Sequence, residues 1–319
     1  MPWRNSPAIK VASEELRDYA ATGAGQQVGR TLAAPVAGRD WANSVEIATI
    51  NYQIWLPRDY GEDPKKRWPL VFFLHGSGEG EGKTCSGKTA SGTEYDLGLN
   101  TVDSVCYHGL PHKIEERETV SSQFVVVSPQ APASAGATWS DEDGVAVSAL
   151  EDLGAAVVQG LDVDPERVYL TGLSMGGAGT WRWASTSPDH FAAIAPICGG
   201  LGRTDPNPLV DIPAWVFVGA DDGGAKGCSE SVETLKELGA DVKYTIYDDA
   251  PAPYQPTDSS PERGPQKGHD SWTAAYEDED LWKWLLAHPA AEGAEGEAAE
   301  ETGGGVLAWV RGLFGGSKL

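Results

Sequence analysis

Short apolar segments, separated by stretches of helical periodicity, constrain the fold of this chain more than any other feature of its sequence. Apolar runs of this length suit strands that are buried on both faces of a sheet. They lie at Leu70–Leu74, Phe124–Val127, Val168–Leu170, Ala192–Ile197, Trp215–Val218 and Val242–Tyr247. The helical stretches lie at Val145–Gln159, Met175–Thr186, Ser229–Leu238 and Asp278–His288. This alternation predicts an α/β fold with a mostly parallel central sheet and helices on both faces.

The composition argues against several classes of partner. The chain has 47 acidic and 24 basic residues and a formal charge of −23, so it repels nucleic-acid phosphates and anionic lipid headgroups. The charge indicates solubility, with attraction of a cationic substrate as the alternative. No run has the length of a membrane span, and the first residues hold no apolar signal core. We expect a soluble protein, cytoplasmic on this sequence, or secreted if a signal peptide was removed.

A Gly-x-Ser-x-Gly pattern follows the apolar strand at residues 168–170. It reads Gly172-Leu-Ser174-Met-Gly176, and a helical stretch begins directly behind it. Two glycines allow a tight strand-to-helix turn that pushes the serine hydroxyl out of the sheet edge, beside the positive end of the helix dipole. The alternative is an incidental serine in an ordinary turn. The strand before it and the helix after it favour Ser174 as a nucleophile.

A serine nucleophile needs a base and, behind the base, an acid. In strand–serine–helix turns of this type the order along the chain is serine, acid, histidine. His269, in a loop after the last predicted strand, fits that order among the six histidines. Two carboxylates follow the strand at 215–218, and Asp222 is the predicted acid with Asp221 as the alternative. Asp248 and Asp249 are weaker candidates.

The oxyanion of the expected intermediate needs two backbone N–H donors. One is predicted from Met175, the residue after the nucleophile. The other is predicted from the loop behind the strand at 70–74, with Ser77 as the first choice and Gly78 as the alternative. His75 in the same loop is expected to be structural.

Two tryptophans near these motifs are predicted to form a substrate-binding wall. Trp139 follows a strand end, and Trp272 lies three residues after His269. Substrate contact and packing are equal alternatives for both. Trp181 and Trp183, on the helix after the serine, are expected to pack. No His-Glu-x-x-His or similar ligand spacing appears, so no metal site is predicted.

Four segments together resemble one esterase family of the α/β-hydrolase superfamily. They read Leu-His-Gly-Ser-Gly at 74–78, Val-Tyr-Leu-Thr-Gly-Leu-Ser-Met-Gly-Gly at 168–177, Phe-Ala-Ala-Ile-Ala-Pro-Ile-Cys-Gly-Gly at 191–200 and Gly-His-Asp-Ser-Trp at 268–272. The family comprises phospholipase/carboxylesterase, polyhydroxybutyrate-depolymerase-like and feruloyl-esterase-like enzymes, some named predicted peptidases. The resemblance implies the α/β-hydrolase fold and carboxylic ester hydrolysis without a metal or organic cofactor. It also implies Ser174, Asp222 and His269 as a catalytic triad.

The resemblance covers residues 45–288, which we take as the catalytic domain. Residues 1–44 are predicted to be an N-terminal extension, with a helical pattern near Ser13–Ala20. Residues 289–319 are predicted to be an acidic low-complexity linker followed by a short apolar tail. Two loops, Gly78–Leu99 and Asp248–Lys267, are unusual for the family, and Val218-Gly219 stands where members usually have His-Gly. Both loops are expected near the strand ends that build the site, where they affect substrate size.

The cysteines leave two states open. Cys85, Cys106, Cys198 and Cys228 contain no CxxC pair, so zinc-ribbon and thioredoxin-type sites are not indicated. Disulfides Cys85–Cys106 and Cys198–Cys228 are weighed equally against four free thiols.

Three functions are compatible with these residues. The first is a serine esterase that acts on a small-molecule or polymer ester, acyl or aryl, including polysaccharide-linked esters and polyesters. The second is a serine peptidase with the same triad. The third is a non-catalytic binding module on a hydrolase scaffold, against which an intact triad argues.

Overall fold

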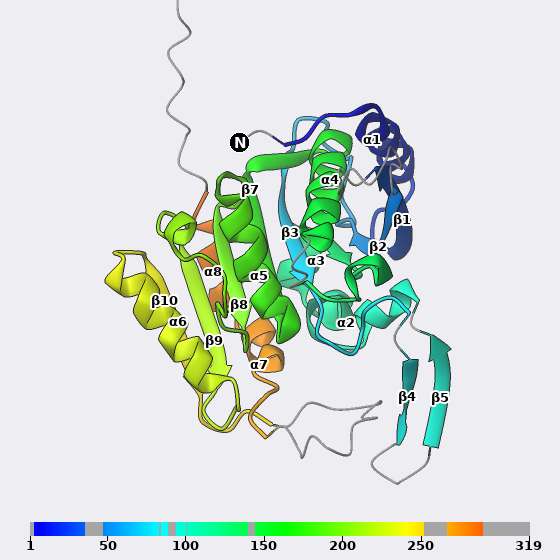
Figure 1. The fold of residues 1–319 in the computed structure, drawn as a ribbon. Helices are drawn as coiled ribbons and strands as arrows, with labels where there is room; N and C mark the ends of the chain where they lie inside the picture. The colour runs from blue at the N-terminus through cyan, green and yellow to red at the C-terminus, as the bar shows by residue number, and fades with distance from the viewer. Residues whose placement is uncertain are drawn as a thin grey trace, which may run out of the picture.

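The computed structural model describes residues 3–35, 47–82, 84–88, 94–99, 101–139, 144–251 and 267–289, and the structural statements below refer to these residues. An eight-stranded sheet runs through the molecule in the order β1-β2-β6-β3-β7-β8-β9-β10 (Figure 1). The strands are β1 (Gln27–Pro35), β2 (Ile47–Trp55), β3 (Trp68–Leu74), β6 (Val125–Pro129), β7 (Val163–Leu173), β8 (Ala193–Ile197), β9 (Ala214–Gly219) and β10 (Val242–Tyr247). β1 and β2 pair antiparallel, as do β2 and β6, and every later pair in the order is parallel.

Helices pack on both faces of this sheet. They are α1 (Pro7–Ala20), α2 (Gly109–Lys113), α3 (Glu118–Gln123), α4 (Val145–Gly160), α5 (Met175–Thr186), α6 (Ala225–Glu237), α7 (Trp272–Glu277) and α8 (Glu279–Leu286). Successive side chains of a strand point to opposite faces. Phe72 of β3 meets Trp183 of α5 edge to face, whereas its neighbour Phe73 meets Tyr276 of α7. α5 and α7 therefore lie on opposite sides of the sheet.

The predicted α/β-hydrolase fold is confirmed, and the strands predicted from apolar runs and the helices predicted from helical periodicity are present. All seven residues of β3 are buried, as a central strand between two helical layers requires. Gly239 follows α6 at φ +91°, the left-handed conformation that ends many helices. Among the described residues, no helix has both the length and the apolar character to cross a lipid bilayer.

The N-terminal segment is part of the same sheet. α1 packs along α4, where Ser13 Oγ donates to the carbonyl of Ala156 at 3.2 Å. β1 pairs with β2 over nine residues. β1 was not predicted from the sequence, because an antiparallel edge strand has no continuous apolar run. The domain boundary at residue 45 stays a prediction, but two elements before it belong to this fold.

The Gly78–Leu99 insertion contains a small antiparallel sheet of β4 (Thr84–Lys88) and β5 (Glu94–Leu99). Figure 1 shows this ribbon standing away from the eight-stranded sheet. Short 3-10 turns occur at Val102–Cys106, Ile114–Glu116, Ala133–Ala135, Pro188–His190 and Asn207–Leu209. The predicted linker and apolar tail after residue 289 and most of the Asp248–Lys267 loop lie outside the described residues.

The described cysteine side chains carry free thiols. Cys198 and Cys228 are buried and unpaired, so a Cys198–Cys228 disulfide is not present. Cys106 is also free. The side chain of Cys85 lies outside the described residues.

Candidate active site

Ser174 occupies a strained turn between β7 and the first residue of α5. Its backbone has φ 53° and ψ −115°, outside the regions that side-chain-bearing residues ordinarily adopt. Such strain persists only where the surroundings hold it, and it is concentrated at functional sites. Its N–H donates to the carbonyl of Ile197 at 2.9 Å, so the end of β8 holds the turn.

The flanking glycines are required by close backbone approach. A Cβ atom at Gly176 would lie 1.9 Å from the carbonyl oxygen of Leu74, and one at Gly172 would lie 2.5 Å from the carbonyl of Gly176. No side chain fits at either distance, so the turn lies directly against the end of β3. The Gly-x-Ser-x-Gly spacing follows from this packing.

We expect Gly176→Ala to destabilise the protein by about 3 kcal/mol or more, because overpacking against immobile backbone is among the costlier core changes. Gly223→Ala is the matched control, since an added Cβ there meets nothing within 4 Å. Urea denaturation of both variants measures the free energy of unfolding. Equal stabilities for the two variants would contradict the tight turn.

Ser174, His269 and Asp222 form one hydrogen-bonded chain. His269 Nδ1 lies 2.7 Å from Asp222 Oδ2, and His269 Nε2 lies 2.9 Å from Ser174 Oγ. A carboxylate only accepts, so Nδ1 carries the proton and donates to Asp222. Nε2 then accepts from the serine hydroxyl. This tautomer is the one in which the imidazole can take the serine proton.

The structure separates the two candidate acids. The Asp222 carboxyl is 4 % exposed, and its second oxygen accepts the N–H of Gly224 at 2.8 Å. The Asp221 side chain is 51 % exposed and pairs with Lys267 Nζ at 2.5 Å. Asp248 and Asp249 are exposed. Asp222, the first choice, is therefore the residue that lies against His269.

Two further glycines bring the acid turn and the histidine loop into contact. A Cβ at Gly219 would lie 1.9 Å from the carbonyl of Gly268, and one at Gly268 would lie 2.7 Å from the N–H nitrogen of Asp222. The residue before the acid turn, Val218, is buried in β9. That the departure from the family's His-Gly is tolerated stays a prediction.

The two predicted oxyanion donors come from neighbouring segments. Met175 begins α5, so its N–H has no acceptor within the helix. Ser77 is exposed in the loop after β3. Gly76 of that loop lies so close to the nucleophile turn that a Cβ there would be 2.8 Å from the Leu173 side chain. The loop with Ser77 therefore borders the turn with Ser174.

His75 anchors this loop and is fully buried. Its Nδ1 donates to the carbonyl of Gly76 at 2.7 Å, and its Nε2 accepts the N–H of Ala131 at 2.9 Å. Both ring nitrogens are thus used by backbone groups, as expected for a structural histidine. Burial lowers the pKa of His75 to about 4.

This histidine should make the stability fall with acid. The unfolded chain binds its proton near pH 6.5, but the folded protein binds it only near pH 4, so the unfolded state holds more protons between those values. We expect the free energy of unfolding to lose about 2 kcal/mol from this group between pH 7 and pH 5. In His75→Gln, whose amide can donate and accept, the free energy of unfolding should fall by about 2 kcal/mol less between pH 7 and pH 5 than in the wild type. Urea titrations at both pH values test this, and identical pH dependence in wild type and variant would contradict it.

The two predicted wall tryptophans have different surroundings. Trp139 is 1 % exposed, and its Nε1 donates to the carbonyl of His75 at 3.0 Å. It packs beneath the loop, so the geometry favours the packing alternative. Trp272 lies edge to face with His269 at 5.4 Å between ring centroids, and with His108 at 5.9 Å in a tilted arrangement. Trp181 and Trp183 are fully buried, as expected.

Three residues at the site were not predicted. Cys198, at φ +44°, presents its sulfur 3.2 Å from the N–H of Ser174, and burial raises the pKa of its thiol well above the ordinary value. Glu79 is buried and accepts the N–H of Gly76 at 2.9 Å. His108, whose pKa burial lowers to about 4, faces Trp272. These three residues lie beside the predicted motifs, but no residue spacing in the sequence identifies them as part of the site.

Within the described residues, Cys198, Asp222 and His269 offer ligand atoms that lie within 4.8 Å of one another. Their types are suitable for a metal ion. The facing atoms of Asp222 and His269 already share a proton at 2.7 Å. A cation bound to both side chains would have to replace that proton and would break the chain to Ser174.

A mostly parallel sheet, a strained serine at a strand-to-helix turn, and an Asp–His pair on later loops define an α/β hydrolase. Residues 47–277 match the model of the Esterase family. The chain belongs to that family.

Curated relatives include feruloyl esterase D of Neurospora crassa, which is 27% identical over 174 residues, or 53% of each chain. A poly(3-hydroxyalkanoate) depolymerase C of Paucimonas lemoignei is 58% identical over 38 residues, which are 12% of this chain and 9% of that protein. The chain thus spans about half the length of the first relative and a small part of the second.

The solved structures agree with the fold. A thermostable esterase superimposes with a TM-score of 0.55 at 26% identity, over 82% of this chain and 63% of that one. A ferulic acid esterase gives a TM-score of 0.53 at 15% identity, over 82% and 99% of the two chains. The second likeness shows the fold alone.

Proposed function

We propose that this protein hydrolyses carboxylic esters through a covalent acyl-serine intermediate. The observation that carries the proposal is the hydrogen-bonded chain Ser174–His269–Asp222, placed at a strained turn. The names and family of the matched proteins support ester bonds as the target.

In the first step Ser174 Oγ attacks the ester carbonyl while His269 Nε2 takes its proton. Asp222 keeps the imidazole in the required tautomer and stabilises the imidazolium. The carbonyl oxygen becomes an oxyanion beside the N–H groups of Met175 and Ser77. His269 then gives the proton to the departing alcohol.

In the second step a water molecule attacks the acyl group, and His269 takes a proton from that water. The tetrahedral intermediate collapses, Ser174 leaves with the proton from His269, and the carboxylic acid departs. The same side chains thus act twice, and the reaction as written uses no cofactor.

The substrate class that we propose is an acyl or aryl ester on a small molecule or a polymer. Both described ends of the Asp248–Lys267 loop support a role in substrate choice, because one contacts the histidine loop and the other contacts the acid turn. Asp270 N–H donates to the carbonyl of Pro251 at 3.0 Å, and Lys267 pairs with Asp221. The ends of a loop at this edge of the sheet lie beside a substrate that enters the site.

Matched substrates separate the esterase from the peptidase with the same side chains. We expect turnover of p-nitrophenyl acetate and of methyl ferulate, with p-nitroacetanilide cleaved at least about 1,000-fold more slowly, since amide barriers are higher. Preference for the anilide would favour the peptidase. Absence of turnover on every ester in a panel that includes hydroxybutyrate oligomers would favour a non-catalytic module.

A further inference from the structure

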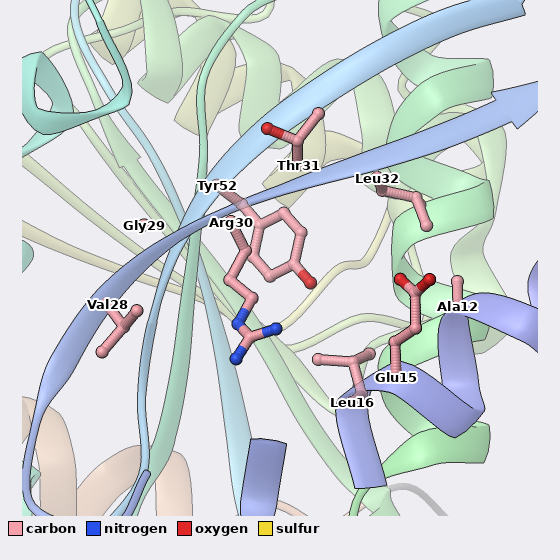
Figure 2. A pocket seen from close by; sticks show the side chains of 9 residues that line it. All are labelled: Ala12, Glu15, Leu16, Val28, Gly29, Arg30, Thr31, Leu32 and Tyr52. Carbon is pink, nitrogen blue, oxygen red and sulfur yellow. The ribbon is translucent and has the colours of Figure 1, made fainter. Parts of the chain in front are cut away.

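A hollow lies beside the antiparallel edge of the sheet, between α1 and the β1–β2 pair. Its volume is about 340 Å³. Figure 2 shows its lining, which comprises Ala12, Glu15, Leu16, Val28, Gly29, Arg30, Thr31, Leu32 and Tyr52. β1 is four strand positions from β7, which is about 19 Å at the usual strand spacing. The proposed ester chemistry therefore does not use this hollow.

Arg30 has no ion pair among the described residues. Its guanidinium stacks over the Tyr19 ring at 4.0 Å from the centroid, and its buried Nε has no hydrogen-bond partner there. This is notable in a chain with 47 acidic and 24 basic residues. Stacking fixes the plane of the guanidinium, and the Arg30 side chain lines the hollow.

Two more polar groups converge on the same space from different elements. Figure 2 shows the Tyr52 hydroxyl of β2 and the Glu15 carboxylate of α1 on the lining of the same hollow as the Arg30 guanidinium of β1. Tyr52 is 4 % exposed, and burial raises its pKa to about 12, so the hydroxyl stays protonated and can donate or accept. The hollow thus offers donors and an acceptor on an apolar floor of Ala12, Leu16 and Leu32.

The charges decide what kind of ligand suits these groups. A carboxylate or phosphate ligand faces Glu15 and a surface of formal charge −23, whereas an ammonium ligand faces Arg30. Neighbouring hydroxyls of a neutral ring carry both acceptors for the guanidinium and donors for the carboxylate. The volume lies at the low end of ligand pockets, where one ring fits.

We propose that this hollow is a saccharide-binding site that holds one neutral sugar ring between Arg30, Tyr52 and Glu15. It lies apart from Ser174 and acts whether or not the protein hydrolyses an ester. An enzyme with such a site can hold a glycan chain while its catalytic residues hydrolyse an ester group.

The test is a saturation-transfer NMR titration of the Ser174→Ala protein with methyl β-xylopyranoside and methyl β-glucopyranoside. Benzoate and benzylamine serve as charged probes of similar size. We expect saturable binding of at least one glycoside with Kd of about 1–10 mM, and none of the charged probes. The proposal is overturned if a charged probe binds and neither glycoside does. It is also overturned if neither glycoside binds saturably at 20-fold the upper expected Kd.

Substitutions in the hollow test whether the glycoside binds there. Glu15→Gln and Tyr52→Phe should each weaken glycoside binding about 5-fold or more, because each removes a hydrogen-bonding partner. Glu14→Gln, at an exposed neighbour outside the lining, should leave it unchanged. Thermal melts confirm that the variants fold, and equal binding by all three overturns the assignment. Since Ser174 is absent throughout, failure here leaves the ester hydrolysis untouched, and loss of hydrolysis leaves this test standing.

Discussion

Ser174→Ala is expected to lower kcat on p-nitrophenyl acetate by about 10⁴-fold or more, since loss of the nucleophile of a serine triad removes the covalent pathway. The structure supplies the reason. Ser174 Oγ lies 2.9 Å from the imidazole nitrogen that takes its proton, and the other described groups at that nitrogen include no second hydroxyl. The fold should survive, because alanine adopts the same backbone with a smaller side chain.

The measurement is steady-state hydrolysis by purified wild type and variant, with circular dichroism as the check on folding. Ser122→Ala on α3, an exposed serine whose hydroxyl donates to the Glu118 carbonyl, is the matched control and should keep wild-type kcat. A folded Ser174→Ala protein that retains more than a tenth of the activity contradicts the assignment of the nucleophile.

Asp222→Asn is expected to lower kcat by about 10⁴-fold, because an amide can donate to His269 Nδ1 and so favours the wrong tautomer. The side chain is 4 % exposed and lies 2.7 Å from that nitrogen. KM should change little, since the acid does not touch the substrate. The pH-rate profile of the residual activity should also change, which a purely structural defect would not produce.

The adjacent carboxylate provides a close internal control. Asp221→Asn should alter kcat less than about 3-fold, because an exposed ion pair with Lys267 contributes little. Loss of activity in Asp221→Asn with activity retained in Asp222→Asn would reverse the assignment of the acid.

The sequence predicts the parts of this molecule that obey a short-range rule. Buried parallel strands need continuous apolar runs, so β3, β6 and β9 could be located from the residues themselves. The Ser174 turn could be located because two close backbone approaches require glycine at fixed spacing. The order serine, acid, histidine along the chain then selected His269 from the six histidines.

Other features depend on three-dimensional packing that no local pattern encodes. β1 is an antiparallel edge strand, so burial on one side leaves no apolar run to detect. Trp139 follows a strand end, where a substrate-binding residue was one of two predicted alternatives. Its indole N–H instead donates to the carbonyl of His75 inside the loop. Asp222 and Asp221 are neighbours in sequence, and it is the close packing of the acid turn against the histidine loop, at Gly219 and Gly268, that brings Asp222 to His269.

Mass spectrometry of the protein after reaction with a fluorophosphonate is the direct test of Ser174 as the covalent nucleophile. A single adduct is expected on the tryptic peptide of residues 168–182, in which Ser174 is the one serine. Labelling should be lost in Ser174→Ala and strongly slowed in His269→Ala. A folded wild-type protein that takes no label, or takes it on another peptide, would contradict the assignment of Ser174 as the nucleophile.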